Sequence, residues 1–186
     1  MNIALIGYSG TGKTTIAKLL AKKLDKKLIS TDDEIVKKTK MSVSQFVKKY
    51  GREKFLDLES EIIENVSGLD ECVFDTKGDI VIRNENIINV KKSALIVMLT
   101  ADTKTIMSRS KSSKSSYIDE TKGVLQEHEF KYEKAADYAI DTSRISPEEA
   151  CHLISHYIQM ELKYNGHKNT GNSGFFQETG RKLKPV

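Results

Sequence analysis

The sequence predicts one α/β domain, built on a parallel β-sheet of five strands with helices on both faces. Short apolar runs alternate with segments of helical length, as in parallel strands joined by crossover helices. Residues 94–99 read Ala-Leu-Ile-Val-Met-Leu and are continuously apolar, as expected of a central strand buried on both sides. A glycine-rich segment also joins the first expected strand directly to the first expected helix. With 186 residues, the chain is long enough for one domain with a substantial core.

The expected elements follow one another in a regular order. The strands are Asn2–Ile6, Lys27–Ser30, Glu71–Asp75, Ala94–Leu99 and Asp137–Asp141. Helices are expected at Thr15–Leu24, Ser42–Tyr50, Arg52–Val66 and Asp102–Ser108. The last helix is expected to begin at Ser146, because Ser146, Pro147 and Glu149 form an N-terminal capping pattern.

The glycine-rich segment Gly7–Thr14 reads Gly-Tyr-Ser-Gly-Thr-Gly-Lys-Thr and fits G-x-x-x-x-G-K-[ST] at every fixed position. Between a strand and a helix, such a loop presents backbone N–H groups and a helix N-terminus to an anion. Lys13 can reach the terminal phosphates, and the Thr14 hydroxyl can ligate Mg²⁺. These features predict a P-loop NTPase fold that binds a nucleotide and Mg²⁺. The residues expected to bind the nucleotide are Gly7, Ser9, Gly10, Thr11, Gly12, Lys13, Thr14 and Thr15.

The motif alone leaves open whether the phosphate goes to water, to a small molecule or nowhere. Acidic residues after the next two strands bear on this, because the carboxyl ends of parallel strands line the ligand site. Asp32 is placed to accept a proton from an acceptor hydroxyl or to position magnesium. Alternatively, Thr31 or Asp32 caps the helix that follows. Asp75 closes the third strand and is expected to help Thr14 hold magnesium, unless it is an ordinary turn residue.

Residues 108–118 are polar, serine-rich and basic. They form either a flexible linker or, in a phosphate-binding domain, a lid that closes over the site. We favour the lid, from which Arg109 or Lys114 would neutralise the transition state.

At this point the chain resembles shikimate kinase, a small P-loop kinase with a five-stranded parallel sheet, over roughly residues 1–160. Besides the loop, residues 28–35 look like that family's D-T-D-x-x-I segment, and residues 41–46 and 51–59 follow its S-I-x-x-I-F and G-E-x-x-F-R-x-x-E patterns. Residues 75–79 fall where the family has A-T-G-G-G, and residues 132–142 look like its L-Y-x-x-V-A-D…V-D-T signature. The resemblance implies transfer of the γ-phosphoryl group of ATP to a hydroxyl group. It also places Arg109 where the family has an arginine that contacts adenine or phosphate.

The departures from the family pattern fall on the acceptor side. Ser30 stands at the family's first acid, which belongs to the magnesium sphere, whereas Asp32 matches the second acid, which contacts the substrate and can serve as base. Leu56 and His128 stand where the family has arginines. The family arginine that Leu56 replaces binds the substrate carboxylate. Leucine cannot replace that bidentate contact. The triple glycine that holds shikimate is Lys77-Gly78-Asp79 here.

We therefore expect a shikimate kinase-like enzyme whose acceptor is not shikimate. The expected catalytic residues are Lys13, Asp32, Arg109 and Lys114. The expected substrate residues are Asp32, Lys77, Gly78, Asp79 and His128. Two alternatives remain: a regulator that binds ATP without turnover, and a nucleotide or nucleoside kinase. The second usually needs more arginines than the four found before the tail, at positions 52, 83, 109 and 144.

Composition restricts the remaining properties. Residues 1–162, the expected kinase domain, carry 25 basic and 25 acidic residues, so a nucleic-acid surface is not indicated. The basic excess lies in residues 163–186, which we expect to form a flexible tail. No apolar run is long enough for a membrane span, and Cys72 and Cys151 show no metal spacing. We expect a cytoplasmic protein with reduced cysteines, acting on a small molecule as a monomer or weak homodimer.

Overall fold

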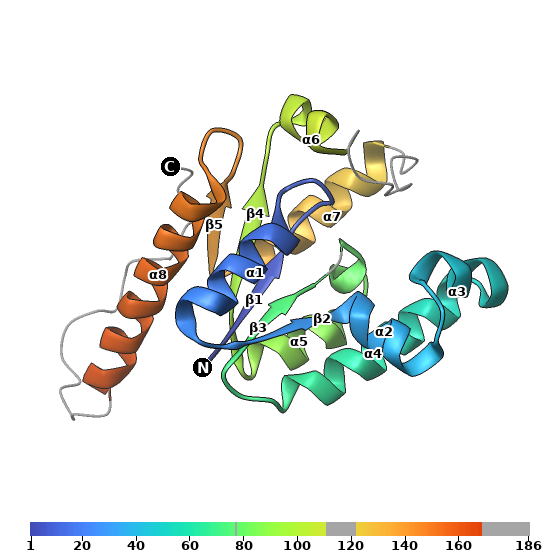
Figure 1. Ribbon diagram of the computed structural model, residues 1–186, viewed down its shortest axis with the longest axis horizontal. Helices are drawn as coiled ribbons and strands as arrows, with labels where there is room; N and C mark the ends of the chain where they lie inside the picture. The colour runs from blue at the N-terminus through green and yellow to red at the C-terminus, as the bar shows by residue number, and fades with distance from the viewer. Residues whose placement is uncertain (77, 111–121, 169–186) are drawn as a thin grey trace.

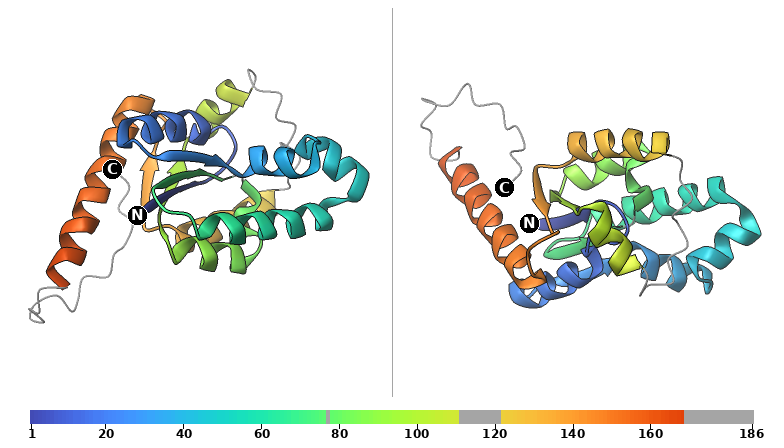
Figure 2. Two further views of the ribbon diagram at one scale, coloured as in Figure 1. Left: turned by 60° about the horizontal axis from the view of Figure 1, so that its bottom comes forward. Right: turned by 90° about the horizontal axis from the view of Figure 1, so that it is seen from above.

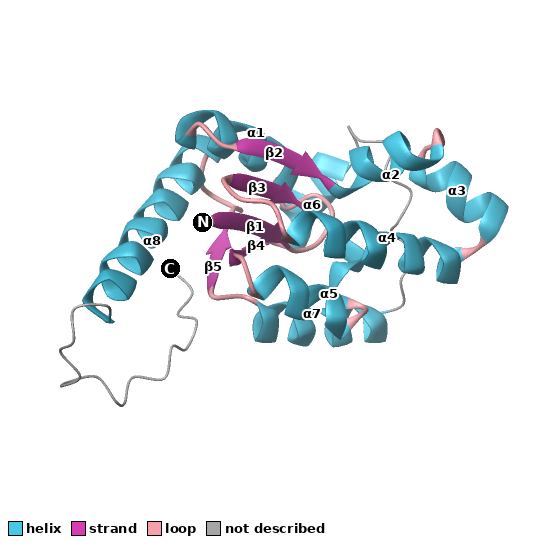
Figure 3. Cartoon of the chain, turned by 90° about the horizontal axis from the view of Figure 1, so that it is seen from below, coloured by secondary structure: helices cyan, strands magenta, loops and turns pink. Residues whose placement is uncertain are grey.

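The computed structural model describes residues 1–76, 78–110 and 122–168 (Figure 1). All five expected strands are present, with ends that agree within one residue. They are β1 (Asn2–Ile6), β2 (Lys27–Ser30), β3 (Cys72–Asp75), β4 (Ala94–Thr100) and β5 (Tyr138–Asp141). Every pair is parallel, and the spatial order is β2-β3-β1-β4-β5 (Figure 3). The predicted α/β fold with a five-stranded parallel sheet is confirmed.

The helices cover both faces of this sheet. They are α1 (Lys13–Leu24), α2 (Thr31–Thr39), α3 (Val43–Tyr50), α4 (Arg52–Ser67), α5 (Asn84–Lys91), α6 (Thr103–Ser110), α7 (Lys122–Ala135) and α8 (Pro147–Lys168), with a short 3-10 helix, η1, at Gly78–Val81. Helices α1 and α8 pack on one face, and α4, α5 and α7 pack on the other (Figures 1 and 3). Helices α2 and α3 extend beyond the carboxyl end of β2 (Figures 2 and 3).

Successive side chains of the central strands alternate between the two faces of the sheet and so contribute to both helical layers. Ile3 and Leu5 of β1 enter the core beneath α1 and α8, whereas Ala4 and Ile6 enter the core beneath α4, α5 and α7. Successive side chains of a strand point to opposite faces, so a strand buried on both faces must be apolar throughout. Strand β4 follows the same rule, which explains the uninterrupted apolar run at residues 94–99.

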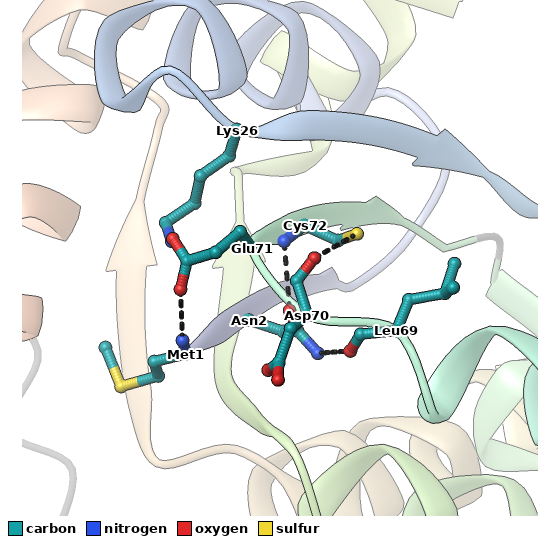
Figure 4. Close-up of polar contacts among 7 residues, drawn as sticks. All are labelled: Met1, Asn2, Lys26, Leu69, Asp70, Glu71 and Cys72. Carbon is teal, nitrogen blue, oxygen red and sulfur yellow. Dashed lines mark hydrogen bonds and ion pairs between the residues drawn. The ribbon is translucent and has the colours of Figure 1, made fainter.

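The amino-terminal edge of the sheet is closed by polar contacts within the protein (Figure 4). The buried Asn2 side chain donates to the Leu69 carbonyl oxygen at 2.6 Å and accepts from the Cys72 backbone nitrogen at 2.9 Å. At the surface beside it, the Glu71 carboxylate pairs with Lys26 and with the amino group of Met1. These contacts tie the start of β1 to the loop that leads into β3.

The expectations for the cysteines and for the last helix can also be compared with the structure. Cys72 and Cys151 are both free and buried. The last helix begins where the capping pattern placed it, since Ser146 and Glu149 exchange hydrogen bonds. It continues to Lys168, beyond the boundary at residue 163 that the composition suggested.

Candidate nucleotide and acceptor site

The glycine-rich loop leaves β1 at the carboxyl edge of the sheet and enters α1 at Lys13. Gly7 has φ +130°, and a Cβ atom there would lie 2.2 Å from the Leu99 carbonyl oxygen of β4. No side chain fits at that distance, so the loop depends on glycine where it passes β4. Gly12 is the N-cap of α1 and is also left-handed, with φ +92°.

Side chains within the loop fix its shape. The buried Lys13 ammonium donates to the carbonyl oxygens of Gly7 and Tyr8, at 2.6 Å each. The Thr11 hydroxyl donates to the same Tyr8 carbonyl at 2.8 Å. In contrast, the side chains of Ser9, Thr14 and Thr15 are exposed. The predicted phosphate-binding residues therefore lie together at the start of α1, with the Thr14 hydroxyl accessible to a metal ion.

Arg109 lies against this loop. From α6, its guanidinium donates through Nη1 to the Gly10 carbonyl at 3.4 Å and to Thr142 Oγ1 at 3.0 Å. Nη2 donates to the Thr142 carbonyl at 2.8 Å. The structure thus brings Arg109 to the glycine-rich loop. Lys114 and residues 111–121 of the expected lid lie outside the described residues.

Asp32 and Asp75 lie at or just beyond the carboxyl ends of neighbouring strands. Ser30, the last residue of β2 and two residues before Asp32, is the register partner of Asp75 in β3. Asp75 is only 1% exposed, and its Oδ1 has no hydrogen-bond partner among the residues that the structure describes. Next to it, the Thr76 hydroxyl donates to the Leu5 carbonyl at 2.7 Å and holds the end of β3 against β1. Asp75 therefore lies on the strand next to the one that leads into the loop.

The alternative in which Thr31 or Asp32 caps α2 is wrong. Ser30 is the N-cap of α2, and its Oγ accepts from the Asp33 backbone nitrogen at 3.4 Å. Serine is a favoured cap because its short side chain reaches the first-turn N–H groups. Asp32 is half-buried in the first turn of α2, so its carboxylate is not committed to capping that helix.

The residues at which the chain departs from the family pattern on the acceptor side include a buried core residue and a buried histidine. Leu56 of α4 is 4% exposed and belongs to the same core cluster as Tyr132 of α7. His128, one helical turn before Tyr132, is buried. The Tyr8 ring of the loop packs edge-to-face on Tyr132, with centroids 5.1 Å apart. Lys77 lies outside the described residues, and of Gly78 and Asp79 the structure describes only the backbone, in η1.

The residues present fit Mg²⁺. Thr14 and Asp75 could supply oxygen ligands, and Oδ1 of Asp75, which lacks a partner among the described residues, is the kind of buried atom that a bound cation or its water would satisfy. Among the described residues, no group of three His, Cys, Asp or Glu could hold a metal ion. Mg²⁺ usually needs only one or two protein ligands beside substrate phosphates, which agrees with this small donor set.

Sequence reasoning gave no individual role to Thr142 or Glu59. Thr142 was recognised only as part of a family signature, although it contacts Arg109 and the loop. Glu59 is buried on α4 one turn after Leu56, and a carboxylate at a core-facing helix position was the available signal.

Comparisons with known proteins agree with this geometry. The family model described as shikimate kinase matches residues 9–159. Shikimate kinase of Thermodesulfovibrio yellowstonii is 37% identical over 160 residues, covering 82% of this chain and 92% of that protein. Shikimate kinase of Caldicellulosiruptor bescii is 33% identical over 175 residues, covering 87% of this chain and 98% of that protein.

Solved structures give the same picture of the fold. Shikimate kinase from Acinetobacter baumannii in complex with shikimate aligns with TM-score 0.79 and 23% identity, covering 86% of this chain and 93% of that one. Shikimate kinase from Aquifex aeolicus aligns with TM-score 0.75 and 26% identity, covering 87% of this chain and 98% of that one. None of the described helices is long and apolar enough to cross a membrane.

Proposed function

This chain belongs to the shikimate kinase family, and we propose that it transfers the γ-phosphoryl group of ATP to a hydroxyl group of a small metabolite other than shikimate. Membership of the family makes the chain an ATP-dependent phosphotransferase with an alcohol group as acceptor. The identity of the acceptor is the part that we propose.

On the nucleotide side, the proposed reaction is an in-line transfer in which positioning and charge stabilisation supply most of the catalysis. Lys13 and the loop backbone hold the phosphates, and Arg109 adds positive charge beside the loop. The Thr14 hydroxyl and Asp75 are the residues that would hold Mg²⁺. When bound, the metal neutralises charge on the transferred phosphoryl group.

The proposed base is Asp32. It lies in the first turn of α2, two residues beyond the strand end that pairs with Asp75, and Ser30 already caps that helix. A carboxylate at this edge can accept the proton that the acceptor hydroxyl loses as its oxygen attacks phosphorus. Lys114 of the expected lid is proposed to add positive charge to the transition state.

The single observation that carries the acceptor proposal is the burial of Leu56 in an apolar cluster. A carboxylate placed against Leu56 would lose its hydration without gaining a cation, which is costly. Recognition then depends on Asp32, Lys77, Gly78, Asp79 and His128. We propose an acceptor that has a hydroxyl group but no carboxylate at the place facing Leu56.

The test is an ADP-release assay with shikimate, polyols without a carboxylate, sugars and amino-acid alcohols. We expect turnover of a carboxylate-free alcohol and little turnover of shikimate. The Leu56→Arg variant should gain affinity for shikimate, whereas the matched Leu56→Met variant should not. Efficient turnover of shikimate by the unchanged chain would contradict the proposal.

Two further outcomes would also contradict it. Tight binding of a nucleoside monophosphate in equilibrium dialysis would favour a nucleotide kinase. ADP binding without turnover of any acceptor would favour a regulatory ATP-binding protein. We also propose that the enzyme acts in the cytoplasm as a monomer or weak homodimer. The buried free cysteines support the proposed compartment.

A further inference from the structure

Thr142 lies where four segments of the chain meet. It directly follows β5, is 2% exposed, and its backbone nitrogen donates to the Thr100 carbonyl of β4 at 2.9 Å. Its Oγ1 lies 3.0 Å from the Thr11 carbonyl in the loop and 2.9 Å from the Thr100 carbonyl. The same Oγ1 and the Thr142 carbonyl both accept hydrogen bonds from Arg109.

The chemistry of a hydroxyl group determines which hydrogen bonds Thr142 donates and which it accepts. Thr142 Oγ1 has one proton and two lone pairs, so it accepts from Arg109 while donating to either Thr11 or Thr100. The Thr142 carbonyl takes a second N–H of the guanidinium, so one residue holds the planar Arg109 head at two points. Hydrogen bonds that involve a charged group are stronger than neutral ones, especially when they are partly buried.

We propose that Thr142 is a positioning residue that fixes Arg109 against the P-loop, so that Arg109 and the loop bind the nucleotide as one unit. The hydroxyl of Thr142 acts through Arg109 rather than on the nucleotide. The inference rests on the proposed function only for the identity of the donor nucleotide. It assigns Arg109 to the nucleotide side of the reaction and away from the choice of acceptor.

The test is calorimetric binding of ADP with Mg²⁺ to the full chain, in a double-mutant cycle. Thr142→Val removes the hydroxyl with little change of shape, and we expect ADP affinity to fall about 10-fold. Thr142→Ser keeps the hydroxyl and should remain within about 2-fold of the unchanged protein. In an Arg109→Met background, Thr142→Val should change ADP affinity by less than about 2-fold, because the guanidinium that Thr142 positions is absent.

The matched control is Thr100→Val. Thr100 is the neighbouring residue on β4, its hydroxyl donates to the Ile140 carbonyl at 3.4 Å, and its side chain has no described contact with Arg109 or the loop. We expect this variant to bind ADP as the unchanged protein does. If Thr142→Val does not fold, Thr142→Ala carries the same test, since its smaller side chain cannot clash.

Three results would overturn the inference: equal ADP affinity for Thr142→Val, an equal loss for Thr142→Ser, or full effects of both mutations in the double variant. A kinetic readout separates positioning from general damage. Thr142→Val should raise the KM for ATP and leave the KM for the acceptor unchanged. Because ADP binding needs no acceptor, a wrong acceptor proposal would leave the binding result intact.

Discussion

At the amino-terminal edge of the sheet, the buried Asn2 side chain has both its donor and its acceptor satisfied within the protein. At the carboxyl edge of the same sheet, the buried Asp75 carboxylate has an oxygen with no hydrogen-bond partner in the described part of the chain. Buried polar groups normally find partners, so the first edge follows the rule and the second departs from it. The departure lies beside the P-loop, where a bound metal ion or its water would supply a partner. The edge with the unsatisfied oxygen is therefore the edge at which we propose that the ligands bind.

The largest expected effect tests the catalytic side of this comparison. Asp32→Asn keeps the shape of the side chain but removes the proposed base, so kcat should fall by about 10²- to 10⁴-fold. Initial rates of ADP release with the identified acceptor measure this. ADP affinity should be unchanged. The control is Asp33→Asn, an exposed neighbour on the same helical turn, which should keep nearly full activity. Equal activity of the two variants would remove Asp32 from the mechanism.

The second prediction concerns the amino-terminal edge. Asn2→Ala leaves the Leu69 carbonyl and the Cys72 N–H without their partner, so the free energy of unfolding should fall by about 2–4 kcal/mol. Urea denaturation measures it. Asn86→Ala is the matched control, because Asn86 is also buried but its side-chain amide has no hydrogen-bond partner among the described residues. Its cost should be clearly smaller, and equal costs would mean that the Asn2 hydrogen bonds are not what stabilises this edge.

The third prediction is that one substitution, Asp75→Asn, raises the stability of the unliganded protein and lowers its affinity for metal. Asp75→Asn removes a buried carboxylate that lacks a partner at Oδ1, so the unliganded protein should become more stable by about 1 kcal/mol. The affinity of the ADP-bound protein for Mn²⁺, measured by electron paramagnetic resonance, should fall about 10-fold. A loss of stability with unchanged Mn²⁺ affinity would make Asp75 a purely structural residue.

The smallest effect is a pH dependence at the amino-terminal edge. The hydrogen bond from Lys26, helped by the amino group of Met1, lowers the pKa of Glu71 from its ordinary 4.5 to about 2. Because the folded pKa is the lower one, this contribution to stability is complete above about pH 4.5 and disappears as the pH falls toward 2. Thermal unfolding scans across that range should show a shallower decline for Glu71→Gln. Parallel curves for the two proteins would show that the exposed pair contributes nothing.

Local patterns predicted the frame of the molecule well. The strands were found because burial on both faces demands continuous apolar residues, and the P-loop because its chemistry fixes spacing within eight residues. The alternative that Thr31 or Asp32 caps α2 missed Ser30, since all three residues are acceptable caps and only the backbone geometry distinguishes them. Helix α5 was not placed, because its Asn-rich sequence has weak helix propensity and the tertiary packing of Val90 stabilises it.

The functional site was predictable only in part for a related reason. The P-loop motif lies within the single short segment Gly7–Thr14, whereas the role of Thr142 depends on Arg109, 33 positions away, and on Thr11, 131 positions away. No pattern in a single sequence reports that Thr142, Thr11 and Arg109 meet. Long-range hydrogen bonds of this kind become visible only when the order of the strands is known.

The close approach of Gly7 to Leu99 has a consequence for protein engineering. Any side chain at position 7 would displace the backbone of β4, so the first residue of the loop is fixed by a neighbouring strand and not by the ligand. A phosphate loop transplanted from another kinase would fit only if the spacing between β1 and β4 came with it. The smallest unit that can be exchanged between such enzymes is therefore the loop together with both strands.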